Sequence, residues 1–208
     1  MKRHALVFAL MIAISAVSLA AQAPAGWKMR ADGSTDAADP DRPGSIQFMG
    51  MSGGFHVVTP QAGVFWNPAN TMTGNYSLKG SFTLLKPSSH TNYYGLVFGG
   101  SNLDGAAQRY NYFLVGQNGT WILKHREGAN ATDIVGRTQN AAVRRPDASG
   151  KSVNDLEVRV AADKVDFLVN GTVVHSAPKS AALATDGLYG FRVNHELEVQ
   201  VNGFTATR

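Results

Sequence analysis

The sequence contains no cysteine among its 208 residues. Disulfide bridges are therefore excluded, and the folded state must be stabilised by packing rather than by covalent cross-links. A chain of this length can bury a substantial hydrophobic core without disulfide cross-links. Without a cysteine near its start, the chain also cannot be lipidated there.

Long apolar runs are also scarce, because only residues 5–17 form one. A basic start at residues 1–4 precedes this run and small residues at 18–23 follow it, which is the build of a secretory signal peptide. We expect residues 1–21 to be a signal peptide and the mature protein to be secreted or periplasmic; an uncleaved anchor is the alternative. Beyond residue 21 no apolar stretch approaches the ~20 residues that cross a bilayer.

Charged residues make up only 16% of the chain, and the formal net charge is +4. Two of the positive charges, Lys2 and Arg3, leave with the signal peptide, which lowers the net charge to +2. The other basic residues are scattered and form no stripe interleaved with aromatics, so nucleic-acid binding is not expected. The motifs G-x-S-x-G and H-E-x-x-H are also missing, which leaves no sequence signal for a hydrolase triad or a zinc protease.

What the sequence does contain is two-residue periodicity, most clearly in residues 92–128. Three apolar, aromatic-rich runs alternate there with Asn, Asp and Gly, which predicts consecutive antiparallel strands. Gln117-Asn118-Gly119 and Asn170-Gly171 are hairpin signals, because Asn and Gly tolerate the positive φ of tight turns. Gly99-Gly100-Ser101 reads as a further turn.

The same pattern recurs along the whole mature chain. Roughly a dozen short strands and no convincing amphipathic helix predict an all-β fold, a sandwich or barrel. We expect a loop-rich segment over residues 22–44 and one β-sandwich domain over residues 45–208.

The second half resembles a known family. The motifs are Tyr94-Gly95-Leu96-Val97-Phe98, then Tyr110-Asn111-Tyr112-Phe113, then Val169-Asn170-Gly171, and finally Gly187-Leu188-Tyr189-Gly190. They resemble the concanavalin A-like lectin/glucanase superfamily, in particular the laminin-G-like jelly-roll domains of bacterial exported proteins. The resemblance implies a jelly-roll β-sandwich of two antiparallel sheets. Its members include sugar binders, hydrolases and adhesive modules.

Retaining glucanases of this superfamily carry paired carboxylates in the pattern E-x-D-x-x-E. The nearest matches here are Asp155-Leu156-Glu157 and Glu196-Leu197-Glu198, and both depart from the pattern. The solvent row of a half-buried strand explains them better. We therefore expect a lectin-like module that binds carbohydrate or another extracellular ligand and has no catalytic residues. The alternatives are a glycoside hydrolase, including the 3-keto-disaccharide hydrolase type, and an adhesive module that recognises protein.

Sugar binding needs aromatic rings for the C–H faces and polar groups for the hydroxyls. Strand periodicity places Tyr110, Tyr112 and Leu114 on one face, and it separates Trp121 from Ile122. Burial of these rings in the core is the alternative for each of them. The candidate ligand-binding residues are Arg109, Tyr110, Tyr112, Trp121, Arg192 and Asn194.

No metal or cofactor is expected. Four acids in the loop-rich segment could offer oxygen ligands to Ca²⁺, although a solvated linker explains them better; they are Asp32, Asp36, Asp39 and Asp41. The histidines of the mature chain are isolated in sequence and are expected at surfaces or strand ends rather than at a metal; they are His56, His90, His125, His175 and His195.

Overall fold

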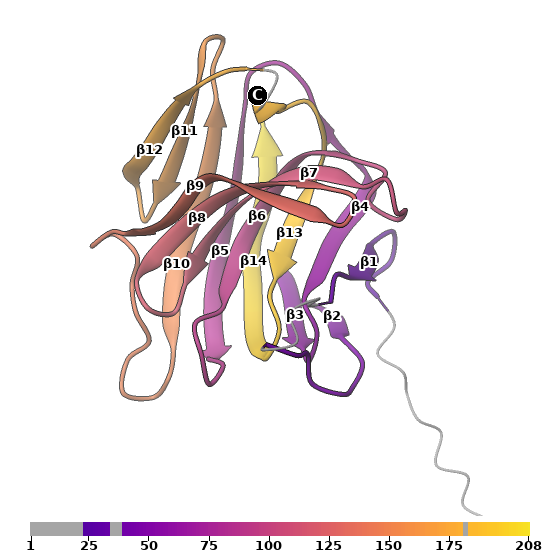
Figure 1. The fold of residues 1–208 in the computed structure, drawn as a ribbon, viewed down its shortest axis with the longest axis vertical. Helices are drawn as coiled ribbons and strands as arrows, with labels where there is room; N and C mark the ends of the chain where they lie inside the picture. Colours follow the sequence, from indigo (N-terminus) through magenta and orange to yellow (C-terminus); the bar gives the residue numbers. More distant parts are fainter. Residues whose placement is uncertain (1–22, 34–38, 181–182) are drawn as a thin grey trace, which may run out of the picture.

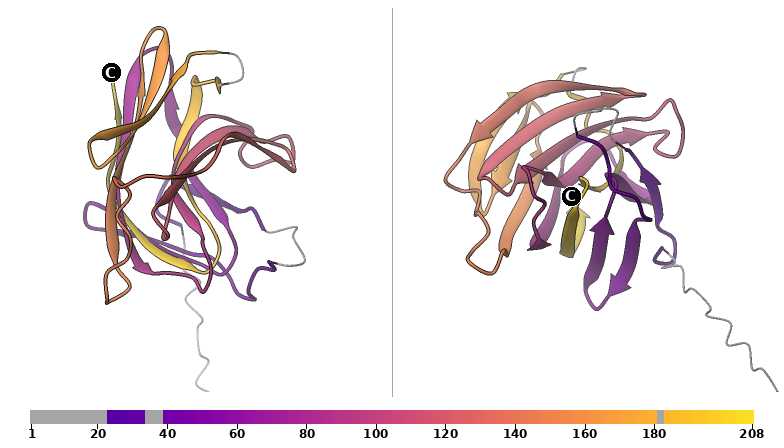
Figure 2. Two further views of the ribbon diagram at one scale, coloured as in Figure 1. Left: turned by 60° about the vertical axis from the view of Figure 1, so that its left-hand side comes forward. Right: turned by 60° about the horizontal axis from the view of Figure 1, so that its bottom comes forward.

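The computed structural model describes residues 23–33, 39–180 and 183–208, so the expected signal peptide lies outside the described residues. These residues form two antiparallel seven-stranded sheets that pack face to face (Figures 1 and 2). The strands of the front sheet, in spatial order, are β1 (Lys28–Ala31), β4 (Gly63–Met72), β13 (Gly187–Val193), β6 (Tyr93–Ser101), β7 (Arg109–Gly116), β8 (Thr120–Glu127) and β9 (Asn130–Gln139). Those of the back sheet are β12 (Thr172–Pro178), β11 (Lys164–Val169), β10 (Ser152–Val160), β5 (Tyr76–Lys86), β14 (Leu197–Thr207), β3 (Gly54–Thr59) and β2 (Gln47–Met51).

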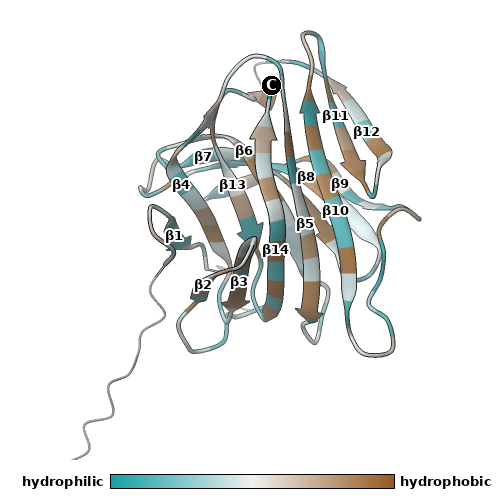
Figure 3. Ribbon diagram, turned by 180° about the vertical axis from the view of Figure 1, so that it is seen from behind, coloured by the Kyte–Doolittle hydropathy of each residue, from teal (hydrophilic) through white to brown (hydrophobic). Residues whose placement is uncertain are grey.

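The back sheet follows the alternation of its sequence. Along β10, Leu156, Val158 and Val160 are buried, while Asp155 and the residues that alternate with them are exposed or half-buried. Figure 3 shows this as teal and brown bands that alternate along β10. Because successive side chains of a strand point to opposite faces, one face enters the core and the other meets solvent. The prediction of an all-β sandwich is confirmed.

The core between the sheets is aromatic. The rings of Phe65 and Phe191 stack with centroids 5.0 Å apart, and Phe48 meets Phe65 at 4.8 Å. At the other end of the sandwich, Phe113 of the front sheet contacts Phe167 of the back sheet at 5.2 Å. Such ring pairs add to the stabilisation that area burial alone provides.

The predicted centre of the chain is confirmed. Residues 92–128 form β6, β7 and β8, which pair antiparallel in sequence order. The hairpin at Asn170-Gly171 has φ values of 50° and 79°, as the two positive values of a type I′ turn require. It joins β11 to β12.

One prediction of local structure needs correction. Gly99-Gly100-Ser101 is not a turn, because it lies inside β6 at a register shift between Phe98 and Ser101. A β-bulge satisfies the local Gly pattern without reversing the chain. The structure also contains a strand that the periodicity does not predict at its full length: β9 spans Asn130–Gln139 as an exposed edge strand with mostly polar residues.

Substitution of Gly99 by Ala should destabilise the fold by about 3 kcal/mol. Gly99 has φ +60°, and a Cβ atom there would lie 2.0 Å from the carbonyl oxygen of Ala184. The matched control is Gly53→Ala, since Gly53 has φ +77° but no heavy atom within 4 Å of the point that a Cβ atom would occupy. Urea unfolding of both variants measures the loss in the free energy of unfolding. Equal losses would mean that the positive φ, and not the contact with Ala184, causes the destabilisation.

The segment before residue 45 contributes to the sheet. β1 pairs with β4 through Lys28 and Trp66 at one end and Ala31 and Gly63 at the other. The front sheet therefore begins at residue 28, within the segment expected to be loop-rich. Within the described residues we find no helix with the length and apolarity needed to cross a bilayer.

Candidate functional site

The front sheet buries side chains on both of its faces. Residues that alternate with the inter-sheet core, together with Leu103 from the segment after β6, form a second cluster on the outer face; they are Val64, Trp66, Tyr93, Val97, Leu103, Tyr110, Tyr112, Leu114 and Ile122. The outer face of an antiparallel sheet commonly meets water, whereas the members of this cluster are at most 6% exposed and are covered by other side chains. We call this surface the outer face.

A buried carboxylate organises one side of the outer face. Asp32 follows β1, and its carboxylate accepts hydrogen bonds from Arg192 of β13 and from Arg126 of β8, the latter at 2.7 Å. The hydroxyl of Tyr110 donates to the same carboxylate at 3.1 Å, and Arg30 approaches it at 3.5 Å. These five residues, which we call the Asp32 cluster, join β1, β13, β7 and β8.

The Asp32 cluster stays charged. Burial opposes ionisation of Asp32, but the positive charges of Arg192 and Arg126, with the hydrogen bonds from Arg192 and Tyr110, outweigh it and lower the pKa of Asp32 below its ordinary value of 3.8. Burial is also the main reason that the pKa of Tyr110 is raised, so its hydroxyl remains a donor. The cluster thus holds one carboxylate among three guanidinium groups.

Acid should weaken this arrangement. A carboxyl group whose pKa is lowered on folding stabilises the protein above its unfolded pKa, and this contribution is lost as pH falls through the folded value. Below about pH 4, the wild-type melting temperature should therefore fall more steeply than that of Asp32→Asn, which lacks the titrating group. Thermal melts between pH 2 and pH 7 compare the two; parallel curves would show that Asp32 does not contribute.

A polar hollow of about 120 Å³ lies beside the Asp32 cluster. It is lined by Tyr93, Tyr112, Ile122, Lys124, Arg137, Arg192 and Asn194. This is room for about four water molecules at ~30 Å³ each, or for a carboxylate and the edge of the ring that bears it. The hollow combines two aromatic rings with three cations and an amide.

Cations cover the rings of the polar hollow. The guanidinium carbon of Arg192 lies 5.4 Å from the centroid of the Tyr112 ring, and that of Arg137 lies 5.9 Å from the Tyr93 ring. Both are within the range of cation–π attraction. Arg192 also donates from Nε to Asn194 Oδ1 at 3.0 Å. Arg192 is thus held against Tyr112 and Asn194, and the exposed Arg137 lies over the Tyr93 ring.

The polar hollow and the Asp32 cluster carry an excess of positive charge. Five cations gather here, namely Arg30, Lys124, Arg126, Arg137 and Arg192. Asp32 pairs with three of them and Asp133 with Lys124, at 2.8 Å. Five cations and two carboxylates leave an excess of three positive charges. Within the described part of the chain, Arg137 has no carboxylate partner within 4 Å.

The structure brings together four of the six candidate ligand-binding residues. Tyr110, Tyr112, Arg192 and Asn194 belong to the Asp32 cluster or line the polar hollow. Tyr110 is fully buried and Tyr112 is 6% exposed, so neither presents an open ring to solvent.

The other two candidates lie elsewhere. Trp121 is 2% exposed and packs in the inter-sheet core with its ring centroid 5.9 Å from that of Phe113. Arg109 is exposed, pairs with Glu127, and lines a separate hollow of about 730 Å³ beside His125 and Asp186. No Trp, Tyr or Phe is found among the described residues that line the larger hollow, so it offers less to a sugar ring.

Three of the four carboxylates considered for catalysis contact basic partners, and the fourth, Asp155, is exposed. On the outer surface of the back sheet, Glu157 accepts hydrogen bonds from Ser77 and Arg159 at 2.8 and 3.1 Å. Glu196 pairs with Arg42 at 2.6 Å, and Glu198 contacts His56 at 2.9 Å. Glu157 and Glu198 lie in strands, as expected for a solvent row, whereas Glu196 lies in the turn before β14 with φ 57°.

The acids considered for Ca²⁺ are divided between two places. Asp32 faces the arginines of its cluster, whereas Asp39 and Asp41 lie beside His90 and His195. Asp36 lies outside the described residues. The described members therefore do not share one oxygen-rich loop.

Comparisons with known proteins place the fold. The sequence matches no family model and no curated protein. Among solved structures, the carbohydrate-binding module CBM66 from Bacillus subtilis superposes with a TM-score of 0.65 at 11% identity, over 88% of this chain and 96% of the module. The fold is a jelly-roll β-sandwich of two antiparallel sheets.

Two further similar structures share this sandwich. The metal-free carbohydrate recognition domain of Emp46p gives a TM-score of 0.52 at 10% identity, over 85% of each chain. An alginate lyase gives 0.50 at 12% identity, over 88% of this chain and 94% of the lyase. At these identities the likeness concerns the backbone alone.

Three residues of the site were missed by the sequence analysis. Lys124 and Arg137 line the polar hollow, and Asp32 is the centre of the charged cluster beside the hollow. The periodicity that places Tyr110 and Tyr112 on one face also places Ile122 and Lys124 there once β8 is paired with β7. Arg137 had no such signal, because β9 shifts register against β8.

Proposed function

We propose that the protein is an exported, non-catalytic module that binds an acidic sugar in the polar hollow of the outer face. The observation that carries the proposal is the convergence of Lys124, Arg137 and Arg192 on a hollow floored by Tyr93 and Tyr112. A guanidinium group binds a carboxylate or sulfate through paired, charge-assisted hydrogen bonds. The tyrosine edges and Asn194 would meet the ring and its hydroxyls.

Acidic sugars are favoured over neutral sugars because cations cover the two tyrosine rings of the hollow. A neutral sugar commonly stacks its C–H face on an open aromatic ring, but Arg137 and Arg192 lie over the two rings here. A negatively charged ligand would instead bind to these cations, and it would not need an open ring on which to stack. The excess of three positive charges around the hollow supports the same class.

The comparisons are compatible with this proposal and do not carry it. Two of the similar structures are described as a carbohydrate-binding module and a carbohydrate recognition domain. We also propose that the chain belongs to the laminin-G-like group, on the basis of its sequence motifs. The proposal that it is secreted or periplasmic rests on residues 1–21.

A hydrolase or lyase is the rival function, since an alginate lyase shares the backbone. The ion pairs of Glu157, Glu196 and Glu198 give it little support, because a glycosidase needs one carboxyl group that can hold a proton. A protein-recognition module is supported still less. The large exposed apolar residues of the described chain lie singly on five strands; they are Met29, Met51, Ile134, Val153 and Val173.

A glycan array tests the proposal at the level of ligand class. The full chain should bind oligosaccharides that carry carboxylate or sulfate groups in preference to neutral ones of equal length. Binding should weaken between 50 mM and 500 mM salt, because a Debye length of ~10 Å at 0.1 M shrinks with ionic strength. Assays of the bound glycans should detect neither new reducing ends nor unsaturated products. Preference for neutral glycans would contradict the charge argument, and turnover would replace the module with an enzyme.

A further inference from the structure

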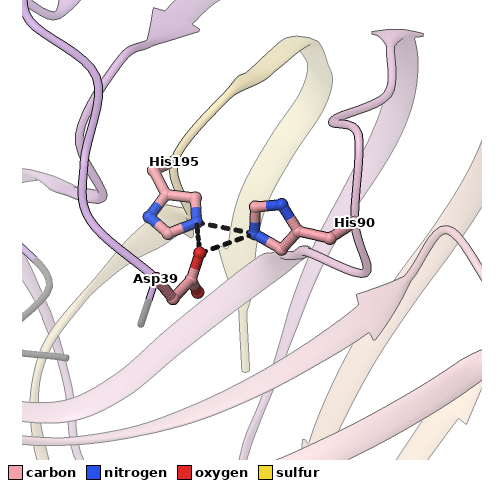
Figure 4. Close-up of side chains that lie close together, drawn as sticks. All are labelled: Asp39, His90 and His195. Atoms are coloured by element: carbon pink, nitrogen blue, oxygen red, sulfur yellow. Dashed lines mark hydrogen bonds and ion pairs between the residues drawn. The ribbon is translucent and has the colours of Figure 1, made fainter. Parts of the chain in front are cut away.

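Two histidines and an aspartate from distant parts of the sequence meet at one end of the sandwich. Asp39 precedes β2, His90 lies between β5 and β6, and His195 lies between β13 and β14. Figure 4 shows their polar atoms pointing toward one another. The Nε2 atoms of His90 and His195 are 2.9 Å apart, and Asp39 Oδ1 lies 3.0 Å from the first and 3.3 Å from the second.

A second carboxylate fixes the orientation of one of these rings. Asp41 Oδ1 lies 2.8 Å from Nδ1 of His195, whose side chain is only 6% exposed. A carboxylate accepts a hydrogen bond, so Nδ1 carries a proton, and in the neutral ring the lone pair of Nε2 points toward Asp39 and His90. A histidine oriented through its other ring nitrogen by a carboxylate is typical of a metal ligand.

The environment of His90 has the same consequence. The side-chain amide nitrogen of Asn92, which is 4% exposed, lies 3.0 Å from Nε2 of His90; it can donate only to an unprotonated Nε2, and a bound ion would take that lone pair in its place. Two imidazole lone pairs and a carboxylate oxygen then face one another within 3.3 Å. Groups rich in electrons repel at this distance unless a cation lies between them, and that cation is either a proton or a metal ion.

We propose that Asp39, His90 and His195 bind a divalent transition-metal ion of the Zn²⁺ type, with Asp41 as the residue that orients His195. A tetrahedral Zn²⁺ with bonds of ~2.0–2.1 Å holds its ligand atoms roughly 3.3 Å apart, so the observed spacings need change by only a few tenths of an ångström. Two imidazole nitrogens suit Zn²⁺ and not Ca²⁺, which prefers six to eight oxygen ligands. Three protein ligands leave a fourth position for water.

Such an ion would join three segments beside the polar hollow. His195 directly follows Asn194, and Asn92 directly precedes Tyr93. The backbone N–H of Asn194 donates to the backbone carbonyl oxygen of Tyr93 at 2.9 Å. The ion would therefore hold the end of β13 against the start of β6. The metal proposal does not depend on sugar binding, because it rests on the ligand geometry alone.

Isothermal titration of the full, tag-free chain with ZnCl₂ after chelator treatment tests the proposal. We expect one Zn²⁺ per chain and a rise in melting temperature on addition of the ion. The Asp41→Asn variant leaves all three ligands in place and should bind Zn²⁺ about 10- to 100-fold more weakly. His90→Ala should bind more weakly still, and Co²⁺ in place of Zn²⁺ should give the visible absorption of a tetrahedral site in the wild type but not in His90→Ala.

The matched control is His56→Gln, since His56 also contacts a carboxylate, that of Glu198, but lies outside the trio. It should bind Zn²⁺ as the wild type does. Absence of both heat and melting shift in the wild type would overturn the proposal and leave a proton between the two rings. Equal weakening in His56→Gln and Asp41→Asn would equally overturn it, as the mark of adventitious surface binding. If His90→Ala fails to fold, Asp41→Asn decides.

Discussion

Replacing Asp32 by Ala should destabilise the protein by about 3–5 kcal/mol, which is the range found when one member of a buried ion pair is removed. The side chain of Asp32 is 4% exposed and those of Arg192 and Arg126 are 10% and 17% exposed. Without the carboxylate, three guanidinium groups repel one another where water cannot screen them fully. For a chain of this size the melting temperature should fall by about 10 °C.

Two comparisons separate this effect from a general sensitivity to substitution. Asp104 forms an exposed pair with Lys28, so Asp104→Asn should leave the melting temperature unchanged. In a double-mutant cycle, Arg192→Met should cost less in the Asp32→Ala background than in the wild type, because the pair is already broken. Additive losses would contradict the account of Asp32 as the partner of Arg192.

The second large effect concerns ligand affinity. Arg137→Ala should weaken binding of an acidic oligosaccharide by about 10- to 100-fold, since a hydrogen bond to a charged group contributes ~1.5–3 kcal/mol. Arg137 is exposed and lies over the Tyr93 ring, so its removal should change stability little. Isothermal titration with the best ligand from the array measures the affinity, and thermal melts check the fold.

Arg109→Ala is the matched control for Arg137→Ala. Both are exposed arginines of the front sheet, but Arg109 lines the larger hollow beside His125. Its loss should leave affinity unchanged if the ligand occupies the polar hollow. The opposite result, with affinity lost in Arg109→Ala and kept in Arg137→Ala, would move the binding site to the larger hollow.

Much of the fold could be predicted because it follows from local periodicity. Alternation along β7 and β8 already separates Tyr110 and Tyr112 from Phe113, and Lys124 from Trp121. The same alternation could have excluded Trp121 from the candidate site, because Trp121 shares a face with Leu123 and the core. Asn170-Gly171 was predictable for the same reason, since its turn depends on two neighbouring residues.

The rest depends on long-range pairing, which periodicity does not encode. β13 inserts between β4 and β6, and only this order brings Arg192 next to Tyr110 and Asp32. The composition around Asp32 is that of a solvated loop, yet three arginines from other strands bury it. His90 and His195 are 105 residues apart and meet only because two turns lie at the same end of the sandwich.

The most direct test of the central claim is the map of amide chemical-shift changes when an acidic oligosaccharide is added to the isotope-labelled protein. Binding in the polar hollow predicts changes concentrated at Tyr93, Tyr112, Lys124, Arg137 and Asn194, with Arg109 and His125 unaffected. Changes that centre on Arg109 and His125, or on the outer surface of the back sheet around Glu157, would contradict the account.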